Sequence, residues 1–243
     1  MTPELALQIG LVIAVASVVA TVAGFGNSLV AMPMLIGLVG VRAAAPMMAL
    51  AGLVTWIVRF VMLRGQITPA VVWRVILASL VTIPLGVAFV SNGPEVWLRT
   101  ALGLMTVSYV IYRWSGRKAP AASGSGWALG VGAFGGVLSG AFNTSGPVIV
   151  MYGDARRWNP NEFRANLAAY FMANLVMVNA THYAAGNITS LVWEGFLVSI
   201  PFVIVGLVAG NLIARKVDRD RFGRLVLLVL FLLGARLALS WIW

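Results

Sequence analysis

The chain lacks cysteine altogether and has a single histidine, His182, among its 243 residues. Without cysteine it cannot form disulfides, thiolate metal sites or iron–sulfur clusters, and it cannot use a thiol in catalysis. Charge is also scarce, because Asp, Glu, Lys and Arg make up 10% of the chain, against roughly 25% in a typical soluble domain. So few charges cannot cover the surface of a water-soluble protein, and the composition excludes a soluble globular enzyme.

An enzyme that works inside the membrane is disfavoured for a related reason. The sequence has no HExxH motif and no pair of carboxylates within an apolar run, and these groupings carry metal-dependent and acid–base hydrolysis. We therefore expect no enzymatic activity, no catalytic residue, no bound metal ion and no cofactor.

Hydrophobic residues make up 60% of the chain, in runs separated by Gly, Pro and charged residues. A helix crosses the hydrocarbon core with about 20 apolar residues. The runs predict an all-α polytopic membrane protein with ten helical segments, two of which are too short to span. The segments are Leu5–Val22, Ser28–Val39, Ala43–Leu63, Ala70–Val90, Val96–Tyr112, Trp127–Ser139, Pro147–Tyr152, Phe163–Ala185, Leu191–Ile213 and Phe222–Ile242.

The positions of the Lys and Arg residues, which give the chain a net charge of +10, predict how it is oriented in the membrane. Basic residues gather near Gly65, in residues 113–118, after Gly153 and in residues 215–224, and the loops between these are nearly bare. Because cytoplasmic loops are rich in Lys and Arg, we place these four loops in the cytoplasm and both termini outside. The positive charge is therefore a topology signal and does not indicate a nucleic-acid partner.

Since the start of the chain lacks a basic region and a small-residue cleavage site, we expect no removable signal peptide.

The two halves of the chain resemble each other. Gly24-Phe-Gly-Asn-Ser28 matches Gly140-Ala-Phe-Asn-Thr144 at an offset of 116 residues. Further on, Gly65-Gln-Ile-Thr68 matches Gly186-Asn-Ile-Thr189 at an offset of 121 residues. Several matches in the same order favour an internal repeat; the alternative is that apolar sequences look alike and the register is accidental.

Each half contains five predicted segments, an odd number, so the second half must enter the membrane upside down. The loop charges agree, because the basic turn at Gly65 corresponds to the bare turn at Gly186. Such inverted-topology repeats are typical of secondary transporters. We expect one integral membrane domain, with residues 1–113 as the first repeat, 114–126 as a cytoplasmic linker and 127–243 as the second repeat.

A Gly-rich break interrupts the apolar pattern at the matching place in each half. Glycine permits the backbone angles that end a helix, and Asn27 or Ser28 can cap the helix that follows. In the second half Pro147 suits the first helical turn. Helix N-termini inside the membrane attract anions through free N–H groups and a partial positive charge, although Gly and Ser can instead simply permit close helix packing. The predicted substrate-binding residues are Gly24, Gly26, Asn27, Ser28, Gly140, Asn143, Thr144, Ser145 and Gly146.

Four further polar residues are candidates for the transport pathway or for ion coupling. Asn166 and Asn174 are eight residues apart and therefore near one helical face, where they line the pathway or bond between helices. Asp154 is a coupling site or a solvated turn residue. His182 carries a proton or is an interfacial histidine without a special role.

The stretch from Gly24 to Leu35 resembles the Gly-rich, Pro-Leu-ending signature of the sulfite exporter TauE/SafE family. Residues 140–152 resemble its degenerate second copy, and the length and two-half organisation fit the family over the whole chain. The chain departs from the signature at Asn27 and Ser28, where typical members carry further glycines. The resemblance implies export of sulfite, related sulfur oxyanions and organosulfonates.

These observations together predict a secondary transporter that exports a small sulfur-containing anion by alternating access. The alternatives are an anion channel built on the same broken helices and a carrier of another small organic anion. We expect the protein in the cytoplasmic membrane of a bacterium or archaeon, with a small anion and membrane lipid as its partners. Whether the chain forms a homodimer is left open.

Overall fold

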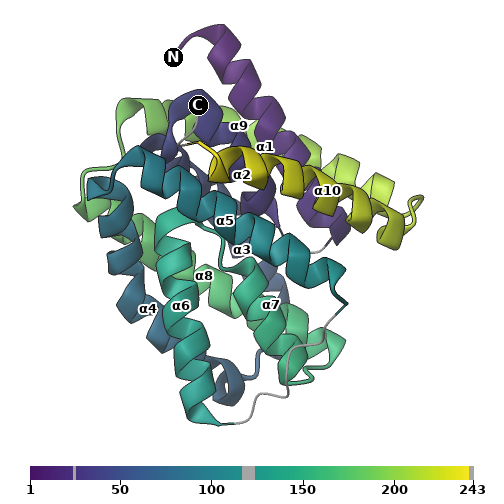
Figure 1. The fold of residues 1–243 in the computed structure, drawn as a ribbon. Coiled ribbons are helices and arrows are strands. Elements are labelled where there is room, and N and C mark those ends of the chain that lie inside the picture. Colours follow the sequence, from purple (N-terminus) through teal and green to yellow (C-terminus); the bar gives the residue numbers. More distant parts are fainter. Residues whose placement is uncertain (24–25, 117–123, 241–243) are drawn as a thin grey trace. The chain divides into compact units, whose positions relative to one another are not determined.

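The computed structural model describes residues 1–23, 26–116 and 124–240. These residues form ten α-helices and one 3-10 helix and include no β-strand (Figure 1), which confirms the all-α prediction. The elements are α1 (Pro3–Ala23), α2 (Asn27–Val39), α3 (Val41–Leu63), η1 (Arg64–Gln66), α4 (Pro69–Asn92), α5 (Glu95–Trp114), α6 (Ser125–Phe142), α7 (Gly146–Ala155), α8 (Pro160–Ala184), α9 (Ser190–Ala214) and α10 (Arg219–Ala238).

Each predicted apolar segment corresponds to one of these helices. Several boundaries differ by three residues: α6 ends at Phe142 and not at Ser139, α7 ends at Ala155 and not at Tyr152, and α8 and α10 begin at Pro160 and Arg219. Most of the predicted linker, residues 117–123, lies outside the described residues. The division into two sequence repeats stays a prediction.

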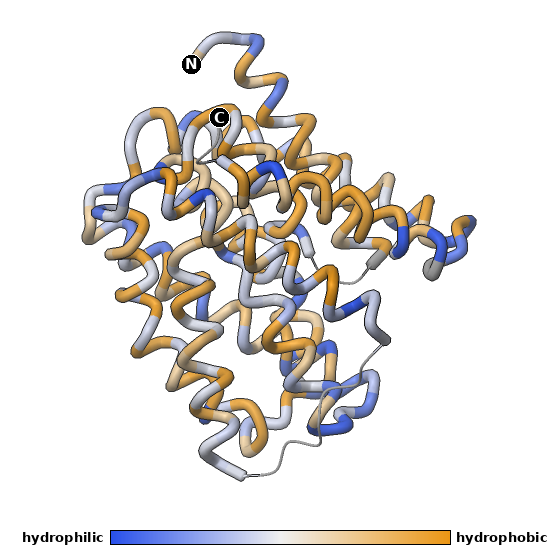
Figure 2. The backbone as a smooth tube through the Cα atoms, in the orientation of Figure 1, coloured by the Kyte–Doolittle hydropathy of each residue, from blue (hydrophilic) through white to orange (hydrophobic). Residues whose placement is uncertain are grey.

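Five helical stretches are long and apolar enough to cross a membrane by length and composition: residues 3–22, 41–66, 69–92, 125–142 and 190–214. Hydrophilic residues are concentrated near helix ends, for example before α10 (Figure 2). On α4, Leu77, Val81 and Leu85 are all more than half exposed, whereas Ser79 and Ile83 are buried. An outward face of large apolar side chains over a buried face with small polar ones is typical of a helix that contacts lipid.

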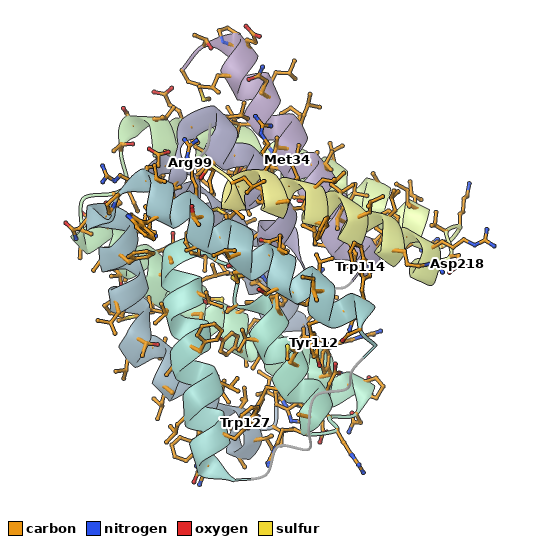
Figure 3. The ribbon with its side chains drawn as sticks, in the orientation of Figure 1. Met34, Arg99, Tyr112, Trp114, Trp127 and Asp218 are labelled. Carbon is orange, nitrogen blue, oxygen red and sulfur yellow. The ribbon has the colours of Figure 1, made fainter. Side chains whose placement is uncertain are left out.

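Charged side chains near the helix ends remain accessible. Arg99 on α5 pairs with Glu95 at 2.7 Å, and Arg221 lies 3.5 Å from Asp218 at the start of α10 (Figure 3). All four side chains are at least one-third exposed. Exposed pairs of this kind add little stability, but they keep the charges away from the apolar interior.

The chain folds into two compact units that each combine segments from both halves of the sequence. The first unit contains residues 1–51, 92–116 and 187–243, and the second contains residues 52–91 and 117–186. The first unit therefore holds the broken helix pair α1–α2, and the second holds the pair α6–α7.

In the second unit, glycines bring α6 into backbone contact with α4. Gly132, Gly136 and Gly140 recur every fourth residue on one face of α6. Their Cα atoms lie directly against backbone oxygens of α4, which belong to Val75, Ser79 and Ile83 in turn. Thr82 strengthens this contact, because its hydroxyl donates to the carbonyl oxygen of Ala133 at 2.7 Å. Close approach through small residues is the usual way for helices to associate in lipid.

In the first unit, α1 packs along α9 through a similar set of small residues. Gly10 lies against the ring of Phe202, Gly206 against Ala14 and Ser17, and Gly210 against Thr21. A second pair, α5 and α10, is held together by Gly103 and Gly234 and by ring contact between Trp114 and Phe231, whose centroids are 5.4 Å apart (Figure 3).

The contacts also show the directions of these helices. Residue numbers rise together along α1 and α9, and likewise along α4 and α6, so both pairs are parallel. In an inverted repeat of five segments, the first segment of one half runs parallel to the fourth segment of the other half. Both pairs have this orientation, and the repeat itself stays a prediction.

Candidate substrate site at the broken helices

The first break lies in the first unit, between the end of α1 at Ala23 and the start of α2 at Asn27. Gly26 has a φ of +96°, a left-handed conformation that favours glycine, and it stands directly before the start of α2. The prediction that Asn27 or Ser28 caps α2 is wrong, because the cap position falls on Gly26, which has no side chain. The predicted site residue Gly24 lies outside the described residues.

The half-helix α2 is buried more completely than the longer helices. It has 13 residues, about 20 Å, which is too short for a hydrocarbon core of about 30 Å. Leu29, Ala31, Met32 and Leu35 are at most 2% exposed. Broken backbone at membrane depth is tolerated only where protein or a wet cavity surrounds it, and the burial of α2 meets this condition. At the break itself, the buried Oδ1 atom of Asn27 has no hydrogen-bond partner among the described residues.

The second break lies in the second unit and is shorter than predicted. The expected break at Gly140 is wrong, because this residue lies inside α6 and packs on Ile83. The chain leaves the helix at Asn143, whose φ of +54° is left-handed, a conformation that asparagine tolerates better than most residues. α7 begins three residues later at Gly146, with Pro147 in its first turn as predicted.

Ser145 occupies the N-cap position of α7 without capping it. Its hydroxyl lies 2.7 Å from the hydroxyl of Ser139 and makes no hydrogen bond to the backbone of α7. The first N–H groups of a helix have no acceptor within the helix. The start of α7 therefore presents N–H groups that the Ser145 side chain leaves uncapped.

Four buried hydroxyls surround this helix start, and we call them the hydroxyl cluster: Ser79, Ser139, Ser145 and Tyr170. They come from α4, α6, the break and α8, and each is at most 4% exposed. The phenol of Tyr170 lies within hydrogen-bonding reach of all three serines. It fits against α6 because Gly135 has no side chain at the point of contact. The cluster offers several neutral O–H donors next to a helix N-terminus.

Of the hydroxyl cluster, only Ser145 was among the predicted site residues. Ser79, Ser139 and Tyr170 were missed, because hydroxyls within apolar runs carry no distinctive sequence pattern. One signal pointed to Tyr170: it lies four residues after Asn166 and four before Asn174, on the face predicted to be polar.

The polar face of α8 is completely buried. Asn166, Tyr170 and Asn174 share this face, and these three residues and His182 are at most 1% exposed, so the prediction that both asparagines lie on one face is confirmed. Asn166 accepts a hydrogen bond from the N–H of Thr68 at 2.9 Å, and Asn174 donates to the carbonyl oxygen of Tyr170 at 2.8 Å. Their role in a pathway stays a prediction.

The other two candidates lie at a distance from the hydroxyl cluster. Asp154 is exposed at the far end of α7, about 13 Å along the helix from Ser145, as a solvated turn residue would be. His182 is buried; it lies twelve residues beyond Tyr170, about 18 Å along α8. Coupling roles for both residues stay predictions.

The comparisons with known proteins decide the family. A model of the sulfite exporter TauE/SafE family matches residues 9–237. The chain belongs to this family. It is 27% identical over 228 residues to the probable sulfite/organosulfonate exporter TauE of Cupriavidus necator, a match that covers 90% of this chain and 88% of that protein. No solved structure matches.

Membership of the TauE/SafE family makes this chain a multi-pass membrane transporter of the exporter class. A family of exporters agrees with the expectation that the chain is not an enzyme. The part of the chain that resembles the TauE/SafE signature coincides with the break between α1 and α2 and with the buried helix α2.

Proposed function

We propose that this chain is a secondary transporter that exports sulfite or an organosulfonate across the cytoplasmic membrane by alternating access. The observation that carries this proposal is the start of α7, where the N-cap residue Ser145 makes no capping bond with its side chain and belongs to the buried hydroxyl cluster. The name of the similar protein, a probable sulfite/organosulfonate exporter, supports the choice of substrate.

The chemistry of this place suits a small oxyanion. Sulfite and sulfonate oxygens are hydrogen-bond acceptors, and serine and tyrosine hydroxyls can donate to them. The helix N-terminus adds about half a positive charge. We therefore assign Ser145, Ser139 and Tyr170 as substrate-binding residues, together with the start of α7. Asn27 and Ser28 at the first break keep their predicted role.

Two features support a carrier mechanism. Each compact unit contains one interrupted helix, and the parallel pairs α1–α9 and α4–α6 have the orientation that an inverted repeat requires. Carriers of this architecture work by moving one bundle against the other around a site near the midplane. For an anion, the inside-negative potential favours export by about 2.3 kcal/mol per charge at 100 mV.

Counterflow in proteoliposomes tests the mechanism. Vesicles that contain the purified protein are loaded with unlabelled methanesulfonate and diluted into a trace of radiolabelled methanesulfonate. A carrier exchanges the two, so we expect the label to accumulate transiently above its outside concentration. Empty vesicles are the control. Flux of label without accumulation would identify an anion channel, and no flux of any sulfur anion would refute the proposed function.

The proposed topology can be tested with single cysteines, since the chain has none of its own. Gln66 in η1 and Ala185 after α8 are both exposed. If both termini are outside, a membrane-impermeant maleimide will label Ala185→Cys in intact cells and will label Gln66→Cys only in opened cells. The reverse pattern would contradict the orientation, and the cysteine-free parent controls for background labelling.

A further inference from the structure

The interior of the second unit contains several polar side chains but no formally charged one. Among its described residues, every Lys, Arg, Asp and Glu side chain is at least partly exposed. Its buried polar side chains are hydroxyls, amides and one imidazole: Ser79, Ser139, Thr144, Ser145, Asn166, Asn174 and His182. An anion at the start of α7 would therefore meet neutral donors and a helix end, with no buried lysine or arginine beside it.

One buried amide has a hydrogen-bond donor left for a ligand. The Nδ2 atom of Asn166 is buried and has no partner within the part of the chain that is described. Buried amide N–H groups are normally hydrogen-bonded. Asn166 lies on the face of α8 that carries Tyr170, whose hydroxyl lies within hydrogen-bonding reach of Ser145 directly before α7. The unpaired donor of Asn166 thus lies on the same face as the hydroxyl cluster. The unpaired Oδ1 atom of Asn174 is an acceptor and would not bind an anion.

We propose that this site accepts its substrate as a monoanion, namely a sulfonate or hydrogensulfite, and discriminates against the dianions sulfite and sulfate. The inference rests on the proposed function and adds the charge state of the substrate to it. The helix end supplies only about half a positive charge. Together with hydrogen bonds from neutral donors, it can stabilise one negative charge. A second charge would be buried without a counter-charge, which is strongly unfavourable in a low-dielectric interior.

The pH dependence of binding to the purified full-length protein tests this. Methanesulfonate has one charge throughout, whereas hydrogensulfite loses its proton near neutral pH. We expect the Kd of methanesulfonate to stay constant. The apparent Kd of sulfite should rise about tenfold per pH unit above its second ionisation, because only the protonated fraction binds. Sulfate should bind more weakly than methanesulfonate at every pH. Sulfite cannot cleave a disulfide of this protein, because the chain lacks cysteine.

Methanesulfonate also controls for titration of the protein itself. His182 is the one side chain of the sequence that ordinarily titrates near neutral pH, and His182→Gln should keep the pH slope of sulfite. The described part of α6 carries no titratable side chain. The titratable and charged groups on the other elements of this unit are Arg59 on α3, Arg64 on η1, Arg74 on α4, Tyr152 and Asp154 on α7, and Glu162, Arg164, Tyr170, His182 and Tyr183 on α8.

A pair of serine variants links the effect to the site. Ser145→Ala should weaken methanesulfonate and hydrogensulfite binding by the same factor without changing the pH slope, while Ser125→Ala at the exposed start of α6 should change neither. Sulfite binding that is independent of pH, or sulfate binding tighter than methanesulfonate binding, would overturn the monoanion inference and leave the proposed function intact. If neither methanesulfonate nor sulfite binds at any pH, the proposed function itself fails.

Discussion

Gly140→Val will separate α6 from α4 and destabilise the protein, whereas Gly130→Val on the same helix will not. A side chain at Gly140 would run into the backbone of Ile83 and Val87. Backbone atoms cannot rotate aside, so α4 itself must move. Inserting a side chain into a packed interior costs typically 1–3 kcal/mol, and we expect this variant at or above the upper end of that range. No atom lies within 4 Å of the corresponding position at Gly130.

The two valine variants form a matched pair, because both replace glycine by the same residue inside α6 and change the helix propensity by the same amount. Thermal unfolding of the detergent-purified proteins measures the difference, with counterflow as the second measurement. We expect Gly140→Val to lose both stability and transport. If it unfolds at the temperature of Gly130→Val and still loses transport, then the glycine acts at the substrate and our assignment of Gly140 to helix packing is wrong.

Tyr170→Phe will lower substrate affinity far more than it changes the fold. The substitution keeps the ring, which is 1% exposed on α8, and removes the hydroxyl that lies within hydrogen-bonding reach of Ser79, Ser139 and Ser145. A hydrogen bond to a charged group contributes about 1.5–3 kcal/mol, so the Kd for methanesulfonate should rise roughly 10- to 100-fold. Titration calorimetry measures this change directly.

Tyr183→Phe is the control for this substitution, because Tyr183 lies on the same helix and is 77% exposed. We expect its affinity and its unfolding temperature to match those of the parent protein. Wild-type affinity in Tyr170→Phe would remove Tyr170 from the substrate-binding residues. An equal loss of affinity in both variants would show that the effect does not arise in the hydroxyl cluster.

Much of the architecture could be predicted because it depends on local properties of the chain. Long apolar runs with few charges have no stable place in water, so the helices and the membrane setting follow from composition alone. The left-handed residue Gly26 was predictable for the same reason, since glycine adopts this conformation without strain. The signature from Gly24 to Leu35 indicated the family that the whole-chain match then established.

The candidate site was less predictable, because it depends on neighbours that are distant in sequence. Gly140 looked like a helix breaker next to Asn143, yet it continues α6 because α4 lies against it. Tyr170 looked like one more aromatic residue of a membrane helix, and its hydroxyl matters only because three serines from other segments meet it. Such contacts leave no periodicity in the sequence.

The sequence by itself determined that this is a helical membrane protein with two interrupted helices, because hydrophobicity and glycine conformation act residue by residue. Only the tertiary structure decided which segments share a compact unit, since α6 and α4 come from different halves and meet through small residues. It also decided where the hydroxyls gather, because a buried O–H group needs a partner, and that partner is set by packing and not by position along the chain.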